Sequence, residues 1–420
     1  MTEIKQIKFP LCYIRSSLNQ GKTIVLNTNL KPFSIKRKTL LPVVQGGMGV
    51  GISAHKLAGT VASLGAMGTI SSVDLRRHHP DLMAQTGKSR DKALIDSVNL
   101  IALDREIQAA NRIAAGGGMV AVNIMRAVAE YAAYVRQACE SGAEAVVVGA
   151  GLPLDLPELT ADHPDVALIP ILSDARGIAL VLKKWMRKNR LPDAIVIENP
   201  RHAAGHLGAA RLEDVDQPQF AFPVVLEATL ALFRELGIER ERIPLIAAGG
   251  IHTHGQLSEL LAMGASAVQL GTAFAVSEEG DAHINFKKVL AGARPEDIVT
   301  FMSVAGLPAR GVRTPWLANY LEKEEKLQRK AGPKECTVGF DCLHQCGLRD
   351  GMAKAGQFCI DTRLAFALEG DVRRGLFFRG AEPLPFGSQI RPVKDLIEFL
   401  LTGRQPGDDP AFQATVHAAA

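Results

Sequence analysis

Two apolar runs, each closed by a glycine loop and joined by a helical pattern, constrain this chain more than any other feature. Each run has the length of a buried strand, and the first loop is followed by the start of a helix. The runs and loops are residues 243–248 with Gly249 and Gly250, and residues 267–270 with Gly271 and Thr272. Glycine lets the backbone approach a ligand closely, and the first N–H groups of a helix lack partners within it. The pattern therefore predicts an anion site, most naturally for a phosphate.

Apolar runs alternate with helical patterns along most of the chain, which indicates an α/β protein. The runs lie at residues 42–45, 66–70, 119–124, 145–149, 166–172, 194–198, 243–248 and 267–270. A parallel barrel needs eight strands, and barrels commonly bind phosphate on the loops after the seventh and eighth. We therefore predict a (β/α)8 TIM barrel. The rival architecture is an open doubly wound sheet.

The chain divides into three predicted parts. Residues 1–40 are expected to form an N-terminal arm. Residues 41–320 are expected to form the barrel, with a helical insertion near 74–118 that is longer than an ordinary barrel loop. Residues 321–420 are expected to form a helical, cysteine-rich C-terminal extension.

Composition argues against several classes of partner. The net charge of the 420-residue chain is only +4, and 5% of its residues are aromatic, so we expect no nucleic-acid partner. No apolar run approaches the roughly 20 residues of a membrane span, so we expect no membrane partner. The N-terminus lacks the pattern of a signal peptide, and we expect a cytoplasmic protein.

The residues that follow the apolar runs are mostly glycines, amides and hydroxyls. Active sites of barrels form at this end of the strands. Carboxylates are few there. Asp174 and Glu198 stand without an evident partner, so no catalytic pair of carboxylates for glycoside hydrolysis is present. Such a site suits a flat, polar, phosphorylated molecule held by backbone groups. Flavin mononucleotide (FMN) is such a molecule.

Seven motifs across roughly residues 41–320 resemble a known family. In order they are PVVQGGMGVGIS, VNIM, VVGAGLP, AAGH, IAAGGI, VQLGTAF and DAHINFK. The same order is found in the nitronate monooxygenases, formerly called 2-nitropropane dioxygenases, and in the flavin-dependent enoyl-acyl-carrier-protein reductases. The motifs are specific for the family and do not choose well between the two groups.

The resemblance implies a barrel carrying non-covalent FMN and assigns roles to several residues. His206 matches the family's catalytic histidine, since a group that titrates near neutrality can take a proton from the carbon beside a nitro group or orient a nitronate. The usual glycine pair before this histidine is Ala204-Gly205 here, and His202 is a rival for the role. The implied cofactor contacts are Gly46, Gly47 and Met48 against the ring, Asn123 and Gly205 near it, and Gly249, Gly250, Gly271 and Thr272 on the phosphate.

Three functions follow as hypotheses. The leading one is an FMN-dependent oxidoreductase of the nitronate monooxygenase type, which converts alkyl nitronates and oxygen to carbonyl compounds and nitrite. The first alternative is reduction of an enoyl thioester, or of a quinone, by NAD(P)H through FMN. The third is a non-catalytic flavin- or metal-binding subunit that transfers electrons. We expect a small-molecule substrate, NAD(P)H as a candidate second partner, and a homodimer as a candidate assembly.

Four cysteines crowd together in the C-terminal extension. They are Cys336, Cys342, Cys346 and Cys359, with a spacing that matches no standard zinc ribbon. Four thiolates within so short a stretch suffice for a zinc ion or an iron–sulfur cluster. The alternative is a set of reduced thiols packed in a small helical subdomain, since free cysteine is commonly buried.

Overall fold

The computed structural model describes residues 15–17, 23–25 and 28–406, so most of the predicted arm and the end of the C-terminal extension lie outside the described residues. Eight parallel strands close into a barrel, in the order β10-β12-β13-β5-β6-β7-β8-β9. These strands are β5 (Val43–Gln45), β6 (Met67–Ser71), β7 (Met119–Met125), β8 (Ala145–Gly149), β9 (Ala167–Leu172), β10 (Ile195–Glu198), β12 (Leu245–Ala248) and β13 (Ala267–Leu270). Each lies on one of the eight predicted runs, which confirms the (β/α)8 barrel and excludes the open sheet.

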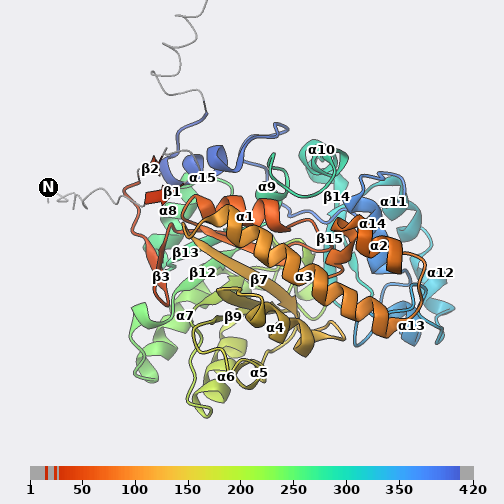
Figure 1. The fold of residues 1–420 in the computed structure, drawn as a ribbon, viewed down its shortest axis with the longest axis horizontal. Coiled ribbons are helices and arrows are strands. Elements are labelled where there is room, and N and C mark those ends of the chain that lie inside the picture. The colour runs from red at the N-terminus through yellow and green to blue at the C-terminus, as the bar shows by residue number, and fades with distance from the viewer. Residues whose placement is uncertain (1–14, 18–22, 26–27, 407–420) are drawn as a thin grey trace, which may run out of the picture.

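Helices surround the barrel (Figure 1). Those that follow its strands are α1 (His55–Ser63), α3 (Lys92–Ala114), α4 (Tyr131–Glu140), α5 (Leu156–Leu159), α6 (Ala175–Met186), α7 (Phe222–Glu235), α8 (His254–Met263) and α9 (Thr272–Ala275). The helix after the eighth strand, α9, is a single turn. The last helix among the described residues, α15 (Val393–Thr402), packs against both α1 and α8. The Leu400 carbonyl lies 2.8 Å from Nδ1 of His254 at this contact.

The start of α1 is held from a distant part of the sequence. Ser53 precedes this helix but does not cap it, because its hydroxyl accepts a hydrogen bond from the Met48 N–H (2.9 Å). The carboxylate of Asp281 accepts from the N–H groups of Ala54 (2.7 Å), Lys56 (3.1 Å) and Leu57 (3.2 Å). An acceptor at this position satisfies the free donors of the first turn, so Asp281 ties the segment after β13 to the first helix.

A short hairpin closes the end of the barrel where its strands begin. Strands β3 (Phe33–Ile35) and β4 (Lys38–Leu40) pair antiparallel, and the side chains of Phe33, Ile35 and Leu40 join the apolar cluster inside the barrel. The Lys38 ammonium donates to the Gly118 carbonyl (2.7 Å) and pairs with Glu144 (2.8 Å). This part of the predicted arm therefore acts as a plug.

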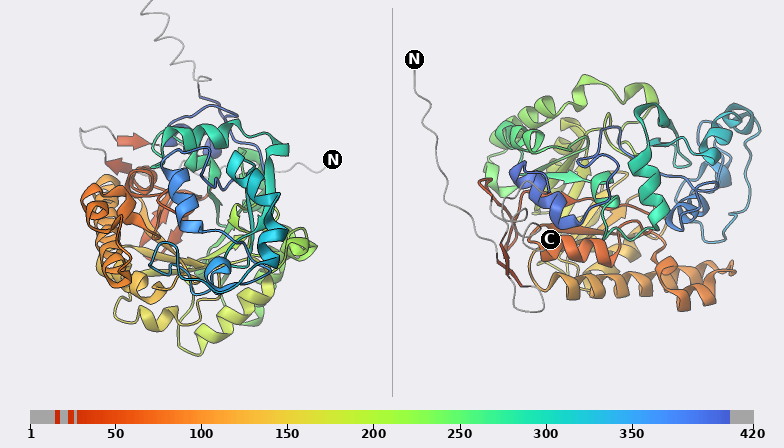
Figure 2. Two further views of the ribbon diagram at one scale, coloured as in Figure 1. Left: turned by 90° about the vertical axis from the view of Figure 1, so that its right-hand side faces the viewer. Right: turned by 90° about the horizontal axis from the view of Figure 1, so that it is seen from above.

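The C-terminal third of the chain covers the opposite end, as the blue and cyan segments of Figure 2 show. Strand β11 (Gly205–His206) pairs with β15 (Pro308–Val312), which pairs with β14 (Ile298–Met302). The helices here are α10 (Ile284–Gly292), α11 (Pro315–Leu321), α12 (Glu324–Arg329), α13 (Gly347–Asp350) and α14 (Ile360–Leu368). The remaining elements are β1 (Arg15–Ser17), β2 (Thr23–Val25) and α2 (Pro80–Thr86). Among the described residues, no helix is both long and apolar enough to cross a membrane.

The tight contact between α1 and the barrel gives a test of the packing. A Cβ at Gly68 of β6 would lie 1.9 Å from the Ala58 carbonyl oxygen of α1, so the helix must move if Gly68 becomes alanine. We expect Gly68→Ala to lower the free energy of unfolding by about 3 kcal/mol, measured by urea denaturation.

The matched control is Gly292→Ala at the end of α10, where a Cβ would meet nothing within 4 Å. We expect that variant to be unchanged or more stable by less than about 1 kcal/mol. Equal stability of both variants would contradict the packing described here.

Candidate active site

Two adjoining cavities open at the carboxyl end of the barrel strands. The first is mainly apolar and contains His206 and Asn123, and the second contains the two glycine loops. Both are lined by Gly47, Glu198, Ala204 and Gln269. The cavities therefore meet at the ends of the first, sixth and eighth barrel strands, which is the end where barrel enzymes carry their active sites.

The glycine loops lie together, as the sequence predicted. Gly249, Gly250, Gly271 and Thr272 all line the second cavity. Gly249 (φ +106°) and Gly250 (φ +80°) adopt left-handed backbone, and a Cβ at Gly250 would lie 2.8 Å from Cγ of His202. Neither of their N–H groups donates to another described residue. Only glycine fits this turn, and its backbone donors remain free for a ligand.

Helix α8 contributes less to this cavity than the sequence suggested. It begins at His254, and its N-cap Thr253 forms a capping box with Gln256. The Gln256 amide oxygen accepts from the N–H groups of His252 (2.9 Å) and Thr253 (3.1 Å). No residue of α8 lines the second cavity, so the glycine loops, and not the helix start, supply its free donors.

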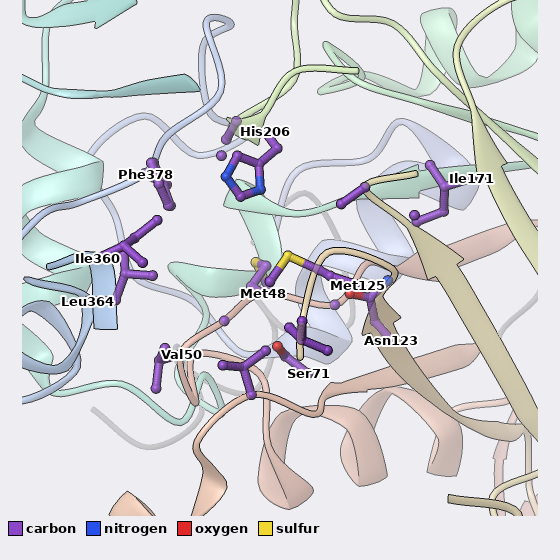
Figure 3. Close-up of a pocket in the computed structure, with 18 of the residues that line it drawn as sticks. Met48, Val50, Ser71, Asn123, Met125, Ile171, His206, Ile360, Leu364 and Phe378 are labelled. Carbon is purple, nitrogen blue, oxygen red and sulfur yellow. The ribbon is translucent and has the colours of Figure 1, made fainter. Parts of the chain in front are cut away.

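The first cavity is formed by loops that pass very close to one another. A Cβ at Gly47 would lie 2.3 Å from Cβ of Asn123, and one at Gly46 would lie 3.1 Å from the Gln269 amide. The Asn123 amide donates to the Val147 carbonyl at 3.3 Å, which fixes its position on β7. In Figure 3, Met48 lies near the centre of this cavity. The glycines thus bring bare backbone against the cavity.

His206 reaches the first cavity from β11. Strand β15 holds it through the pairs Gly205 with Arg310 and His206 with Ala309. The buried Arg310 guanidinium also donates to the carbonyls of Ala203 and Pro200. In Figure 3 the His206 ring faces Ser71 and Val50 across the cavity. The pairing of β11 with β15 and the buried Arg310 guanidinium therefore position the His206 side chain.

The electrostatics of His206 differ from the expected titration near neutrality. Burial lowers the pKa of His206 to about 4, because the imidazolium loses its hydration. Its Nε2 atom is buried and has no hydrogen-bond partner among the described residues. The imidazole is therefore neutral at pH 7, with one ring nitrogen free for a bound molecule.

Glu198 shows the opposite effect at the end of β10. Burial raises the pKa of Glu198 to about 7, because an isolated carboxylate is costly in this environment. The side chain lines both cavities. The sequence placed Glu198 at a strand end without a partner, and that isolation was the one signal of its raised pKa.

The second histidine of this loop lies on the other side of the site. His202 lines the second cavity and not the first, and its Nδ1 is 2.7 Å from Oε1 of Glu382. A Cβ at Gly250 would strike its ring. His202 is therefore placed against the glycine loops, away from the cavity that His206 faces.

Comparison with known proteins adds to this geometry. A family model described as nitronate monooxygenase matches residues 31–403. The chain belongs to the nitronate monooxygenase family. It is therefore an FMN-dependent oxidoreductase of that type, and the suspected family resemblance is confirmed.

Individual relatives are distant. A probable nitronate monooxygenase of Bacillus subtilis is 26% identical over 317 residues, which are 73% of this chain and 84% of that protein. The nitronate monooxygenase of Pseudomonas aeruginosa is 35% identical over 120 residues, which are 29% of this chain and 31% of that protein.

Two solved structures share the fold. FabK from Thermotoga maritima has a TM-score of 0.57 and 23% identity, covering 92% of this chain and 95% of its own. A nitroalkane oxidase from Streptomyces ansochromogenes has a TM-score of 0.57 and 20% identity, covering 90% and 97%.

In this member of the nitronate monooxygenase family, the C-terminal third also lines the site. Leu364, Ile360 and Phe378 form one wall of the first cavity (Figure 3), and Gly380 and Glu382 line the second. These residues could not be predicted, because nothing local in the sequence shows that the extension folds back over the barrel.

Asp361, at the start of α14, brings another carboxyl group to the first cavity. Burial and the neighbouring carboxyl of Asp74 raise the pKa of Asp361 to about 7, although the Arg77 guanidinium donates to its Oδ2 at 2.8 Å. Its Oδ1 has no partner among the described residues. The extension thus adds a buried polar group opposite the barrel.

The four clustered cysteines lie behind this wall. Cys336, Cys342, Cys346 and Cys359 are free thiols that line one small cavity. Within the described ranges, no three histidine, cysteine or acidic side chains are arranged to hold a metal ion. The metal sites expected from the sequence therefore stay predictions.

The pKa of Glu198 gives a test. Because the folded pKa of about 7 exceeds the ordinary 4.5, wild-type stability falls as pH rises from 4.5 to 7. Glu198→Gln removes this loss, because glutamine does not ionise. We therefore expect the free energy of unfolding of the variant, minus that of the wild type, to increase by up to about 3 kcal/mol from pH 5 to pH 8, measured by urea denaturation.

The control is Glu259→Gln on the exposed face of α8, whose effect should not change with pH. If the effect of Glu198→Gln on the free energy of unfolding is also independent of pH, Glu198 ionises as an ordinary carboxylate and the burial argument is wrong.

Proposed function

We propose that FMN binds across the two cavities. The phosphate would be held by backbone at Gly249, Gly250, Gly271 and Thr272. The ring would lie in the first cavity against Gly46, Gly47 and Met48, beside Asn123 and Gly205. Two observations support the fit: the glycine loops leave free N–H donors in one cavity, and that cavity continues into the apolar one.

We further propose that the substrate is an alkyl nitronate, which is oxidised with O2 to a carbonyl compound and nitrite. When bound, the flavin supplies the redox and oxygen chemistry. The apolar walls, including Val50, Met125 and Phe378, would exclude water and bind the alkyl part of the substrate. The nitronate head is an anion and needs a hydrogen-bond donor in so apolar a cavity.

The observation that carries this proposal is the unpartnered Nε2 of His206 in that cavity. A neutral imidazole has one N–H and one lone pair. It can donate a hydrogen bond to a nitronate oxygen, or accept a proton from the carbon beside a nitro group. Glu198, whose pKa lies near neutrality, can hold or release a proton close by.

The direct experiment is anaerobic mixing of the flavin-loaded protein with an alkyl nitronate while the flavin absorbance is followed. We expect the oxidised flavin band to bleach. An unchanged spectrum would exclude nitronates as substrates and would leave the flavin proposal intact.

A second candidate is reduction of an enoyl thioester or a quinone by NAD(P)H. One observation favours it: a third cavity, lined by Ser173, Arg176 and Phe220, also reaches Glu198 and His206. A second reactant could occupy this space. Bleaching of the flavin by NAD(P)H, with turnover of a crotonyl thioester or a quinone, would support this candidate.

The two histidines of the sixth-strand loop should differ in a measurable way. We expect His206→Asn to lower kcat/KM for the nitronate by about 10²–10⁴-fold with flavin content retained, because asparagine is polar but has no ring nitrogen that can accept a proton. We expect His202→Asn to weaken flavin binding and to leave the rate per bound flavin within a few-fold of wild type. The reverse pattern would assign the catalytic role to His202.

The glycine loop gives a test of cofactor binding. Gly250→Ala combines an unfavourable backbone conformation with a Cβ 2.8 Å from the His202 ring. We expect it to weaken FMN binding at least tenfold, measured by titration of flavin fluorescence. The control is Gly255→Ala in α8, where the nearest atom is 3.9 Å away and flavin affinity should stay within a factor of two.

A further inference from the structure

The cysteine cavity has the chemistry of a ligand site. Its four thiols come from one short stretch: Cys336 and Cys342 lie between α12 and α13, and Cys346 and Cys359 are the residues just before α13 and α14. All four side chains line the same cavity. Sulfur is the ligand that zinc and iron–sulfur clusters use in proteins.

A hydrogen-bond donor points at one of the sulfur atoms. The Thr362 hydroxyl donates to Sγ of Cys359 at 3.2 Å. Donors to sulfur stabilise thiolates and tune metal–sulfur centres, whereas thiols that only pack in a core need none.

The arrangement fits a cluster better than a single ion. A zinc ion holds four sulfurs at about 2.3 Å from one point. Among the described residues no three side chains converge in that way, although the four cysteines surround one cavity. An iron–sulfur cluster binds its thiolates at separate iron atoms, so its ligands stand farther apart.

We propose that Cys336, Cys342, Cys346 and Cys359 ligate an iron–sulfur cluster behind the wall of the active-site cavity. Each thiol loses its proton on ligation, and each sulfur bonds to one iron. Cys342, Leu343 and Ile360 line both cavities, so the cluster would be separated from the proposed flavin cavity by one layer of side chains.

The test is metal analysis of the full-length protein, purified without oxygen and then reconstituted with ferrous iron and sulfide under reducing conditions. We expect about four iron and four acid-labile sulfide per chain. We also expect absorbance near 400 nm that bleaches with dithionite, and an electron paramagnetic resonance signal from the reduced protein. These readouts do not depend on nitronate turnover, so they can fail or succeed independently of the proposed function.

Single variants assign the ligands. Cys346→Ser and Cys359→Ser should lower iron and sulfide content at least severalfold, while Cys139→Ser in α4, a buried thiol outside the cavity, should leave both unchanged. Flavin content reports the folding of each variant. The proposal is overturned if the reconstituted wild-type protein contains zinc alone, or no metal with four reactive thiols, or if Cys139→Ser loses as much iron as the ligand variants.

Discussion

The candidate site depends on the parallel pairing of β12 with β13. Their hydrogen-bonded register aligns Ala248 with Gln269, so the two strands end at nearly the same level of the barrel. The loops that follow must therefore come together, and glycine allows both to turn without side chains between them. A one-residue slip would turn every side chain of a strand to its other face and separate the loops. The regular geometry of the barrel thus brings the free N–H groups of the two loops together at one place.

Burial controls the chemistry next to those loops. The same desolvation that lowers the pKa of His206 raises that of Glu198, because each group loses the water that favours its charged form. Both are therefore able to be uncharged near neutral pH. An apolar cavity with uncharged polar groups can accept an anionic substrate without a fixed negative charge opposing it. The C-terminal third contributes to this effect because its side chains close one wall.

Local patterns in the sequence were enough for the barrel and for the glycine loops. Eight apolar runs gave eight strands, and the helical insertion near residues 74–118 contains α3. Features that depend on distant partners were missed. The carboxylate of Asp281, far along the chain, bonds to the free donors at the start of α1. The docking of the hairpin β3–β4 inside the barrel, the strand β15 that holds His206, and the return of Phe378 to the cavity also depend on residues far apart in the sequence, for which a single sequence carries no signal. The acidity of Glu198 likewise follows from surroundings that only the folded chain supplies.

The position of α15 has a consequence for the order in which the molecule is completed. A ribosome releases β5 well before α15, yet α15 sits between α1 and α8 in the outer ring. The barrel wall therefore has an open seam until α15 has emerged. The segment that crosses the glycine loops, where the Gly380 N–H donates to the Thr272 hydroxyl at 3.0 Å, arrives in the same late interval. A cofactor that enters during biosynthesis would find its loops exposed first and covered last.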